Sequence, residues 1–230
     1  MTDYPQTCPD PDVRQLICEI GRRMYDKNFV AANDGNISAK VDANTVWVTP
    51  TGVSKGYMTP DMMMKMDLSG KVVSGTMEPT SEIKMHLRVY NENPDINAVV
   101  HAHPPVATSY AIAGIALDKP ILPEAVVVLG TVLVAPYATP GSQDVPDSIA
   151  PFCKDYNAVL LANHGAITWG VDLMQAYFRM ECLEHYAHIM MYTTNILKQY
   201  NELNCSQISD LIAIREKMGI LAGGVPNCAP

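Results

Sequence analysis

Hydrophobic and polar positions follow two spacings along this chain, one typical of helices and one typical of strands. Near the N-terminus, apolar residues recur every three or four positions. This spacing predicts an amphipathic helix that opens at Pro11 behind Asp10 and carries Val13, Ile17 and Met24 on one face. Short β-branched runs predict strands at 45–49, 97–103, 126–134 and 158–162.

Capping residues and helix-breaking prolines predict further helices between and after these strands. They run from Thr80-Ser81 to Pro94, from Pro104-Pro105 to Gly114, from Asp172 to about Leu197, and onward from about Ser206. Strands that alternate with helices predict an α/β fold. No internal repeat or linker divides the sequence, so we expect residues 1–230 to form a single domain with a mobile tail at 221–230.

Composition narrows the class of protein. With 230 residues, of which 48% are hydrophobic and 17% charged, the chain can bury a sizeable core, which argues against disorder. A net charge of −8 without a Lys/Arg cluster argues against nucleic acid or an acidic membrane as partner. No apolar run reaches the roughly 18 residues that span a bilayer, and the acidic, proline-rich start lacks a signal pattern. We therefore expect a cytoplasmic protein.

Sulfur-containing residues carry no clear chemistry in the sequence. The cysteines are scattered without a CxxC pair, and we interpret all of them as reduced thiols. They are Cys8, Cys18, Cys153, Cys182, Cys205 and Cys228. Four of the 14 methionines cluster at 62–66, and we interpret this cluster as core packing rather than as a metal site.

Three of the six histidines stand out by position. His101 and His103 are two residues apart on a predicted strand, so their side chains leave the same face. His164 follows another predicted strand and precedes a glycine that lets the chain turn closely. Three such imidazoles are the ligand set of a catalytic zinc, which keeps a position open for water or substrate. The alternative is that each histidine only forms local hydrogen bonds, and the spacing does not decide between the two.

One pair and one triplet of ionisable residues lie at helical spacing. Glu82 and His86 share one helix face, where Glu82 could act as a general base near a metal-bound substrate or ligate the metal itself. The alternative is an ordinary surface ion pair, which the two residues alone favour. Glu181, His185 and His188 also align on one side of a helix, but no partner segment accompanies them. We do not expect a metal at that second place.

Small polar segments at 33–38, 49–52 and 80–81 provide a different kind of site. Glycine-rich turns and helix N-termini present backbone N–H groups, and hydroxyl groups add further donors. Together these three segments could hold a phosphate dianion, and the binding would be local enough to suit an acidic protein. Each segment by itself is equally consistent with an ordinary turn.

The ordered set of motifs resembles the class II aldolase/adducin-head family over roughly residues 13–197. The motifs are GNIS (35–38), TPTG (49–52), TSEIKMH (80–86), NAVVHAHP (97–104), APYATPGS (135–142) and NHGAITWG (163–170). The resemblance implies a three-layer α/β/α sandwich with a mostly antiparallel central sheet. It also implies a homotetramer with active sites at subunit interfaces.

The resemblance further implies roles for individual residues. His101, His103 and His164 match the family's ligands for one Zn²⁺ per subunit, and Glu82 matches its acid/base residue. The positions that match the family's phosphate-binding residues are Gly35, Asn36, Thr51, Gly52, Thr80 and Ser81. Mn²⁺, Fe²⁺ or Co²⁺ would also suit imidazoles with a carboxylate nearby. We expect burial to raise the pKa of Glu82 from its free value of about 4.3 toward neutrality.

The implied activity is a lyase reaction on a phosphorylated sugar. A ketose 1-phosphate such as L-fuculose 1-phosphate would be cleaved to dihydroxyacetone phosphate and a small aldehyde, with the zinc stabilising the negative charge of an enediolate. Other members of the family use the same chemistry as sugar-phosphate 4-epimerases, dehydratases or decarboxylases. A non-catalytic scaffold like the adducin head lacks the metal histidines, so the retained histidines and Glu82 argue against that class.

One departure bears on the substrate. Members that cleave fuculose phosphate use a tyrosine from the neighbouring subunit as proton donor, and the corresponding position here falls near Leu122. No tyrosine lies between Tyr110 and Tyr137, and Glu124 is the ionisable side chain nearest to that position. Glu124 is therefore a candidate second acid. The departure leaves the epimerase, dehydratase and decarboxylase alternatives open.

Overall fold

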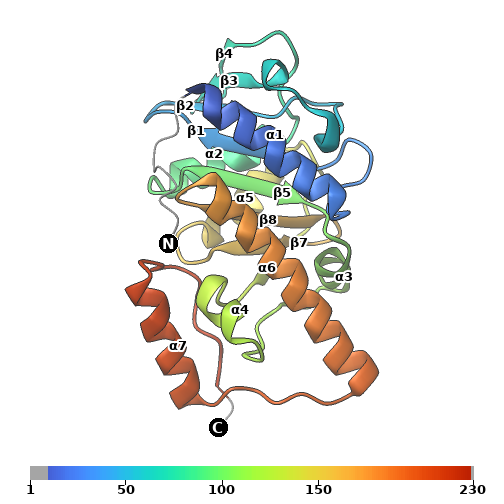
Figure 1. Ribbon diagram of the computed structural model, residues 1–230, viewed down its shortest axis with the longest axis vertical. Coiled ribbons are helices and arrows are strands. Elements are labelled where there is room, and N and C mark those ends of the chain that lie inside the picture. Colours follow the sequence, from blue (N-terminus) through green and yellow to red (C-terminus); the bar gives the residue numbers. More distant parts are fainter. Residues whose placement is uncertain (1–9, 229–230) are drawn as a thin grey trace.

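The computed structural model describes residues 10–228 and has a central sheet with helices on both faces (Figure 1). The eight strands follow the order β4-β3-β2-β1-β5-β8-β7-β6. They are β1 (Asn36–Lys40), β2 (Thr45–Val48), β3 (Met64–Asp67), β4 (Val72–Ser74), β5 (Ala98–Ala102), β6 (Leu133–Ala135), β7 (Ala158–Leu161) and β8 (Gly165–Gly170). Every neighbouring pair is antiparallel except β6 and β7. The mostly antiparallel α/β/α fold that the resemblance implies is thus confirmed.

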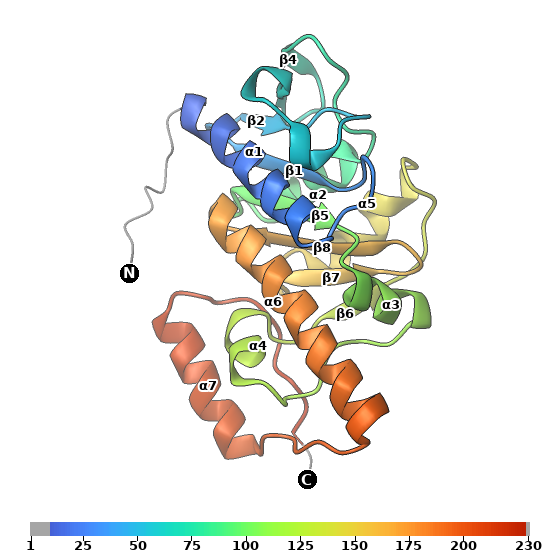
Figure 2. The ribbon, with the colours of Figure 1, turned by 45° about the vertical axis from the view of Figure 1, so that its right-hand side comes forward.

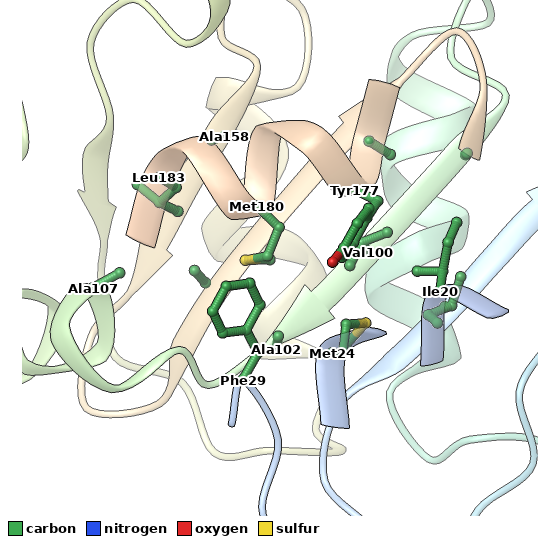
Figure 3. Close-up of a cluster of buried hydrophobic side chains, with 14 of the residues drawn as sticks. Ile20, Met24, Phe29, Val100, Ala102, Ala107, Ala158, Tyr177, Met180 and Leu183 are labelled. Atoms are coloured by element: carbon green, nitrogen blue, oxygen red, sulfur yellow. The ribbon is translucent and has the colours of Figure 1, made fainter. Parts of the chain in front are cut away.

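Helices cover the two faces of the sheet in separate layers. They are α1 (Asp10–Asp26), α2 (Ile83–Glu92), α3 (Pro105–Ala113), α4 (Pro123–Val128), α5 (Asp144–Ile149), α6 (Leu173–Met191) and α7 (Cys205–Lys217). Helices α1 and α6 lie on the near side of the sheet in Figure 1, whereas α2 and α5 lie behind it. A close-up of the core on the near side shows Met24, Phe29 and Met180 between the helices and strand β5 (Figure 3).

Strand β5 illustrates how one strand serves both layers. Ala98, Val100 and Ala102 belong to the core beneath α1 and α6, whereas Val99 belongs to the core beneath α2 and α5. Because side chains alternate along a strand, the neighbour of Val100 and Ala102, His101, faces the α2 layer together with Val99. The period of two along this strand therefore decides which layer receives the imidazole.

Most predicted elements are present, and one is wrong. The predicted strand at 126–134 begins as helix α4, and strand β6 starts only at Leu133. Pro123 occupies the first turn of α4, and Gly130 follows the helix with a φ of 75°. The valines at 126–128 are therefore helical, since a short apolar run fits a buried helix as well as a buried strand.

Helix α6 begins as its sequence predicts and ends differently. The Asp172 side chain accepts a hydrogen bond of 2.7 Å from the backbone N–H of Gln175, which caps the helix. The α-helix ends at Met191 and continues as a π-helical turn over Tyr192–Leu197.

The C-terminal segment, where the sequence predicts a mobile tail, forms hydrogen bonds with the rest of the molecule. Figure 2 shows α7 and the chain that follows it beside α4. Gly223 accepts a 2.7 Å hydrogen bond from the backbone N–H of Thr131, and Gly224 accepts one of 2.8 Å from Arg215. Residues 229–230 lie outside the described part of the chain.

A disulfide joins Cys205 at the start of α7 to Cys228 in this segment. The interpretation of these two residues as reduced thiols is therefore wrong, because helix α7 and the returning chain bring together cysteines 23 residues apart. Cys18, Cys153 and Cys182 are free thiols, and Cys8 lies outside the described residues. None of the helices over residues 10–228 is long and apolar enough to cross a membrane.

Candidate metal centre

Three imidazoles converge where strand β5 ends beside the turn between β7 and β8. His101 lies on β5, His103 follows the end of that strand, and His164 precedes β8 by one residue. One ring nitrogen of each histidine lies within 4.8 Å of a ring nitrogen of each of the other two. The ring centroids are 4.8 to 5.0 Å apart. The structure thus brings together the three ligands that the sequence predicts.

The backbone of the β7–β8 turn allows this close approach. Strands β5 and β8 are paired so that Ala102 lies opposite Ala166. Asn163 adopts a left-handed conformation with a φ of 58°. A Cβ atom at Gly165 would lie 2.5 Å from Cδ2 of His103 and 2.6 Å from the carbonyl oxygen of Ala102. A glycine is therefore required at 165 for the two histidine-bearing segments to meet.

The ring nitrogens are arranged as a cation would require. The carbonyl oxygen of Ala166 lies 2.9 Å from His101 Nδ1, so in the neutral ring that nitrogen carries the proton and Nε2 has a free lone pair. Asp34 lies 3.5 Å from His103 Nδ1, which favours the same tautomer in that ring. The two Nε2 atoms then face each other at 3.1 Å. Two facing lone pairs are satisfied by a shared cation, and three imidazoles suit one that keeps a coordination position open.

The surroundings shift the pKa values of the two rings on the β5 side in opposite directions. Burial, together with the nearby rings of His101 and His164, lowers the pKa of His103 to about 4. Burial also opposes a charge on His101, but the Glu82 carboxylate beside it raises the pKa of His101 overall. His103 is therefore neutral at pH 7, as a metal ligand must be, whereas the Glu82 carboxylate favours the protonated form of His101, whose Nε2 proton a metal would displace.

Glu82 comes immediately before α2, and its carboxylate faces the histidines. Oε2 lies 3.3 Å from Nε2 of His101, and Oε1 lies 3.2 Å from Nε2 of His164. Burial by itself raises the pKa of Glu82, but the charge on His101 and hydrogen bonds from both histidines outweigh it and lower the pKa overall. The predicted rise toward neutrality is wrong for this arrangement, because local sequence does not show which groups contact the carboxylate.

His86 does not form the surface ion pair that its spacing from Glu82 suggests. The ring is fully buried and hydrogen-bonds to Oδ1 of Asn36 at 2.6 Å and to Oγ of Ser38 at 2.7 Å. The other end of the Asn36 amide donates a hydrogen bond of 2.8 Å to Oε2 of Glu82. Burial lowers the pKa of His86 to about 3, so the ring is neutral. Asn36 therefore stands between Glu82 and His86.

The three polar segments predicted to hold a phosphate lie side by side. The backbone N–H of Thr51 donates to Glu78, and that of Thr80 donates to Thr49, at 3.0 and 3.1 Å. Thr49 Oγ1 in turn accepts from the backbone N–H of Ile37 at 3.2 Å. Among the six predicted positions, Gly35 and Gly52 both have a φ of 73°, which suits glycine. Exposed positions remain at Thr51, Gly52 and Ser81.

Lys55 is a residue of this region that the sequence analysis missed. Its side chain is only 1% exposed, and its ammonium group donates to the carbonyl oxygens of Asn33 and Val53 at 2.8 and 2.7 Å. Burial lowers its pKa to about 8, against the opposing effect of the carboxylates of Asp34 and Glu82. Lys55 thus joins the loop before β1 to the loop after β2. A lysine inside a polar turn gives no periodic signal that could have revealed its burial.

Other candidate residues are not brought to this centre within the chain. Glu124 is exposed on α4, which packs against α6 and α7. Glu181 accepts a hydrogen bond from Tyr177, and His188 bonds to the carbonyl oxygen of Glu184 at 3.2 Å. Over residues 10–228, the only cluster of potential ligands that could hold a metal is the one formed by the three histidines.

A cavity in the described part of the chain is separate from the histidines. It has a volume of about 560 Å³ and lies beside Val13, Asp42, Asn97 and Asp172. Asn97 precedes strand β5, whereas His101 and His103 lie at the strand's other end. The cavity therefore lies at the end of strand β5 that is opposite the histidines.

Comparison with known proteins agrees with this geometry. The family model described as "Class II Aldolase and Adducin N-terminal domain" matches residues 15–191, which include all three histidines, Glu82 and the polar segments. The chain belongs to the class II aldolase/adducin family. The match confirms the family that the motifs indicate.

Named relatives cover most of the chain. An L-fuculose phosphate aldolase of Methanococcus maripaludis is 35% identical over 188 residues, which are 80% of this chain and 99% of the relative. A 3-oxo-tetronate 4-phosphate decarboxylase of Haemophilus influenzae is 32% identical over 197 residues, 82% of this chain and 88% of the relative. A solved L-fuculose 1-phosphate aldolase superposes with a TM-score of 0.82 at 29% identity, covering 90% of this chain and 96% of its own. The relatives in this class II aldolase family are thus lyases, and this chain is an enzyme of that kind.

Proposed function

We propose that this protein is a zinc-dependent aldolase that cleaves a ketose 1-phosphate, such as L-fuculose 1-phosphate, to dihydroxyacetone phosphate and a small aldehyde. The observation that carries the proposal is the convergence of three imidazoles with a carboxylate 3.2 to 3.3 Å from two of them. The relative from Methanococcus maripaludis, named an L-fuculose phosphate aldolase, supports the choice of substrate.

His101, His103 and His164 would hold the metal ion, one per subunit. A divalent cation at this place supplies positive charge that stabilises the negative charge developing on substrate oxygen atoms when the carbon–carbon bond breaks. Zinc suits three imidazoles with an open coordination position, and Mn²⁺, Fe²⁺ or Co²⁺ would also fit the donor atoms.

Glu82 would move the proton. Its carboxylate takes a proton from the carbon of the dihydroxyacetone phosphate fragment in the direction of synthesis and returns it during cleavage. The pKa of Glu82 is lowered by charged histidines and raised by burial. Metal ligation would make the histidines neutral, and the positive charge of the cation would then favour the ionised carboxylate, which is the form that accepts a proton.

The polar segments would hold the phosphate group. Thr51, Gly52 and Ser81 are exposed beside the buried Thr80, and the preceding strand contributes Gly35 and Asn36. Backbone N–H groups in glycine turns and hydroxyl groups bind a dianion without a field of basic residues. Because Asn36 uses one amide hydrogen on Glu82, it would donate its second amide hydrogen to the phosphate.

The decisive experiment is an assay of substrate cleavage. The purified protein, loaded with Zn²⁺, is incubated with a panel of five- and six-carbon ketose phosphates, and release of dihydroxyacetone phosphate is measured by coupled reduction. We expect release from at least one ketose 1-phosphate. No release from any member of the panel would reject the aldolase assignment.

A second candidate keeps the site and changes the reaction to decarboxylation, epimerisation or dehydration. Two points favour it: the position at which members that cleave fuculose phosphate carry a tyrosine falls near Leu122, and a relative at 32% identity is named a 3-oxo-tetronate 4-phosphate decarboxylase. Glu124 would then serve as the second acid, contributed to the site of a neighbouring subunit. Mass spectrometry of the products separates these reactions, because an epimer conserves mass whereas loss of water or carbon dioxide does not.

We also propose that the chain forms a single domain, assembles as a homotetramer and works in the cytoplasm. Ile112 and Ile115 at the end of α3 are 58% and 53% exposed, and an interface between subunits would cover such side chains. Light scattering coupled to size-exclusion chromatography tests the assembly. A monomer at micromolar concentration would contradict it and would leave Glu124 without a neighbouring site.

A further inference from the structure

We propose that His86 is a positioning residue that orients the Glu82 carboxylate through the side-chain amide of Asn36. The consequence for catalysis rests on the proposed function of Glu82, whereas the hydrogen-bonding arrangement itself does not. The hydrogen bond between Asn36 and Glu82 joins distant parts of the chain, since the two residues are 46 positions apart.

The direction of every hydrogen bond in this chain of contacts follows from the carboxylate. An ionised carboxylate only accepts, so Nδ2 of Asn36 must be the donor in its 2.8 Å contact with Glu82 Oε2. Oδ1 of Asn36 is then the acceptor at its other end, and Nε2 of His86 must donate to it over 2.6 Å. His86 therefore holds its proton on Nε2.

The same reasoning continues behind the ring. With its proton on Nε2, His86 accepts at Nδ1 from the hydroxyl of Ser38, which lies 2.7 Å away. Ser38 Oγ in turn accepts from the hydroxyl of Tyr90 at 2.7 Å. Tyr90 and His86 both belong to α2, at helical spacing, and Ser38 faces them from strand β1.

Burial excludes the alternative orientation of the Asn36 amide. The exposed fractions of Asn36, Ser38, His86 and Tyr90 are 2%, 0%, 0% and 1%, so water cannot replace a missing partner. A rotated Asn36 amide would place its oxygen against the Glu82 carboxylate and its NH₂ group against the His86 N–H. Both contacts would then be repulsive and two buried polar atoms would lack partners.

The two oxygens of Glu82 therefore have different environments. Oε2 accepts from Asn36 and also lies 3.3 Å from Nε2 of His101, whereas Oε1 receives nothing from Asn36 and lies 3.2 Å from Nε2 of His164. Oε1 is thus the oxygen available to carry the proton at the reacting carbon. His86 determines which oxygen this is, because it allows Asn36 only one orientation.

Two substitutions separate this role from mere filling of the core. The amide nitrogen of glutamine reaches the place of His Nε2 and can donate to Asn36, whereas the shorter asparagine amide reaches only the place of Nδ1. We expect His86→Gln to keep kcat within about fivefold of wild type and His86→Asn to lower kcat by about 10²-fold, with KM and bound metal changed less than about twofold in both. His185→Gln and His185→Asn on the exposed face of α6 are the matched controls and leave all three quantities unchanged.

Nitrogen-15 NMR of the metal-loaded wild-type protein with labelled histidine gives a readout that does not depend on activity. The proposal expects one neutral ring protonated on Nε2, assigned to His86 by the loss of its signal in His86→Gln. A His86 ring protonated on Nδ1 overturns the proposal, and so does an equal loss of kcat in the two substitutions or no loss in His86→Asn. If no ketose phosphate is cleaved, the proposed function fails while the NMR result still decides the orientation of Asn36.

Discussion

Gly165 approaches His103 so closely that a Cβ atom at position 165 would lie 2.5 Å from the imidazole ring. It would also lie 2.6 Å from the carbonyl oxygen of Ala102, which belongs to the strand and cannot rotate away. The packing of these two residues therefore couples the geometry of the turn to the position of a metal ligand.

We expect Gly165→Ala to weaken zinc binding by at least about tenfold and to lower the free energy of unfolding by about 1–3 kcal/mol. The added methyl group must push either His103 or strand β5 out of place. Zinc affinity measured by competition with a chelator, and urea unfolding, check the two effects. Gly219→Ala is the control for zinc affinity: open space surrounds that position, but its φ of 75° strains an alanine, so stability should fall while zinc affinity stays unchanged. Unchanged zinc affinity in Gly165→Ala would contradict the close contact.

Removing one imidazole should abolish the metal site. We expect His103→Ala to lose bound metal and at least about 10²-fold in kcat/KM, since charge stabilisation by a metal ion contributes several kcal/mol to lowering the barrier. Metal content by mass spectrometry and initial rates measure both. His185→Ala, on the exposed face of α6, should change neither. Metal loss in His185→Ala instead would show that the ligands are assigned to the wrong histidines.

Metal binding should release a proton near neutral pH. The pKa of His101 is raised by Glu82, so the ring is protonated over a wider range of pH than a free histidine, and a metal must displace that proton. Zinc affinity should therefore fall as the pH falls. Calorimetric titration in buffers of different ionisation enthalpy measures the released proton, and equal heats in all of them would contradict the prediction.

Lys55 should make stability depend on pH in the alkaline range. Its pKa is lowered to about 8 in the folded protein from 10.5, so the unfolded chain binds more protons between these values and stability rises with pH across that window. Relative to Lys55→Met, the wild type should gain up to about 3 kcal/mol between pH 7.5 and 10. Urea unfolding of both proteins gives the difference. A constant difference across the window would show that the ammonium is solvated.

Reduction of the Cys205–Cys228 disulfide should destabilise the C-terminal segment. The bond closes a loop with a sequence separation of 23 residues, which corresponds to a loss of up to about 3 kcal/mol on reduction. Thermal unfolding with and without dithiothreitol measures this loss. Cys205→Ser should reproduce the effect and abolish the response to dithiothreitol, whereas Cys182→Ser, which removes a free thiol, should retain that response.

The convergence of the three histidines could be predicted because its signal is local. His101 and His103 are two residues apart, and the period of a strand puts them on one face regardless of what surrounds it. His164 follows a buried strand and precedes a glycine, which is also visible in the sequence. The resemblance to a family then supplied the antiparallel sheet, which alternation of strands and helices by itself does not predict.

The partners of Glu82 could not be predicted because they depend on contacts between distant segments. The sequence places Asn36 in a polar turn, whereas in the structure it begins strand β1 and donates a hydrogen bond to Glu82, 46 positions later. Lys55 is similarly buried by two carbonyl groups in loops on either side of β1 and β2. The sign of the Glu82 pKa shift follows from such contacts, so composition and burial alone gave the wrong sign.

Strand β5 also constrains how this gene can change. Since Val99 and His101 face one layer and Val100 and Ala102 face the other, deletion of one codon between positions 98 and 100 would turn both β5-side imidazoles toward α6. Insertion of one codon would have the same effect, while two codons would restore the facing and shift the rings along the strand. Length variation among descendants of this sequence should therefore accumulate in its loops and be purged from these few positions.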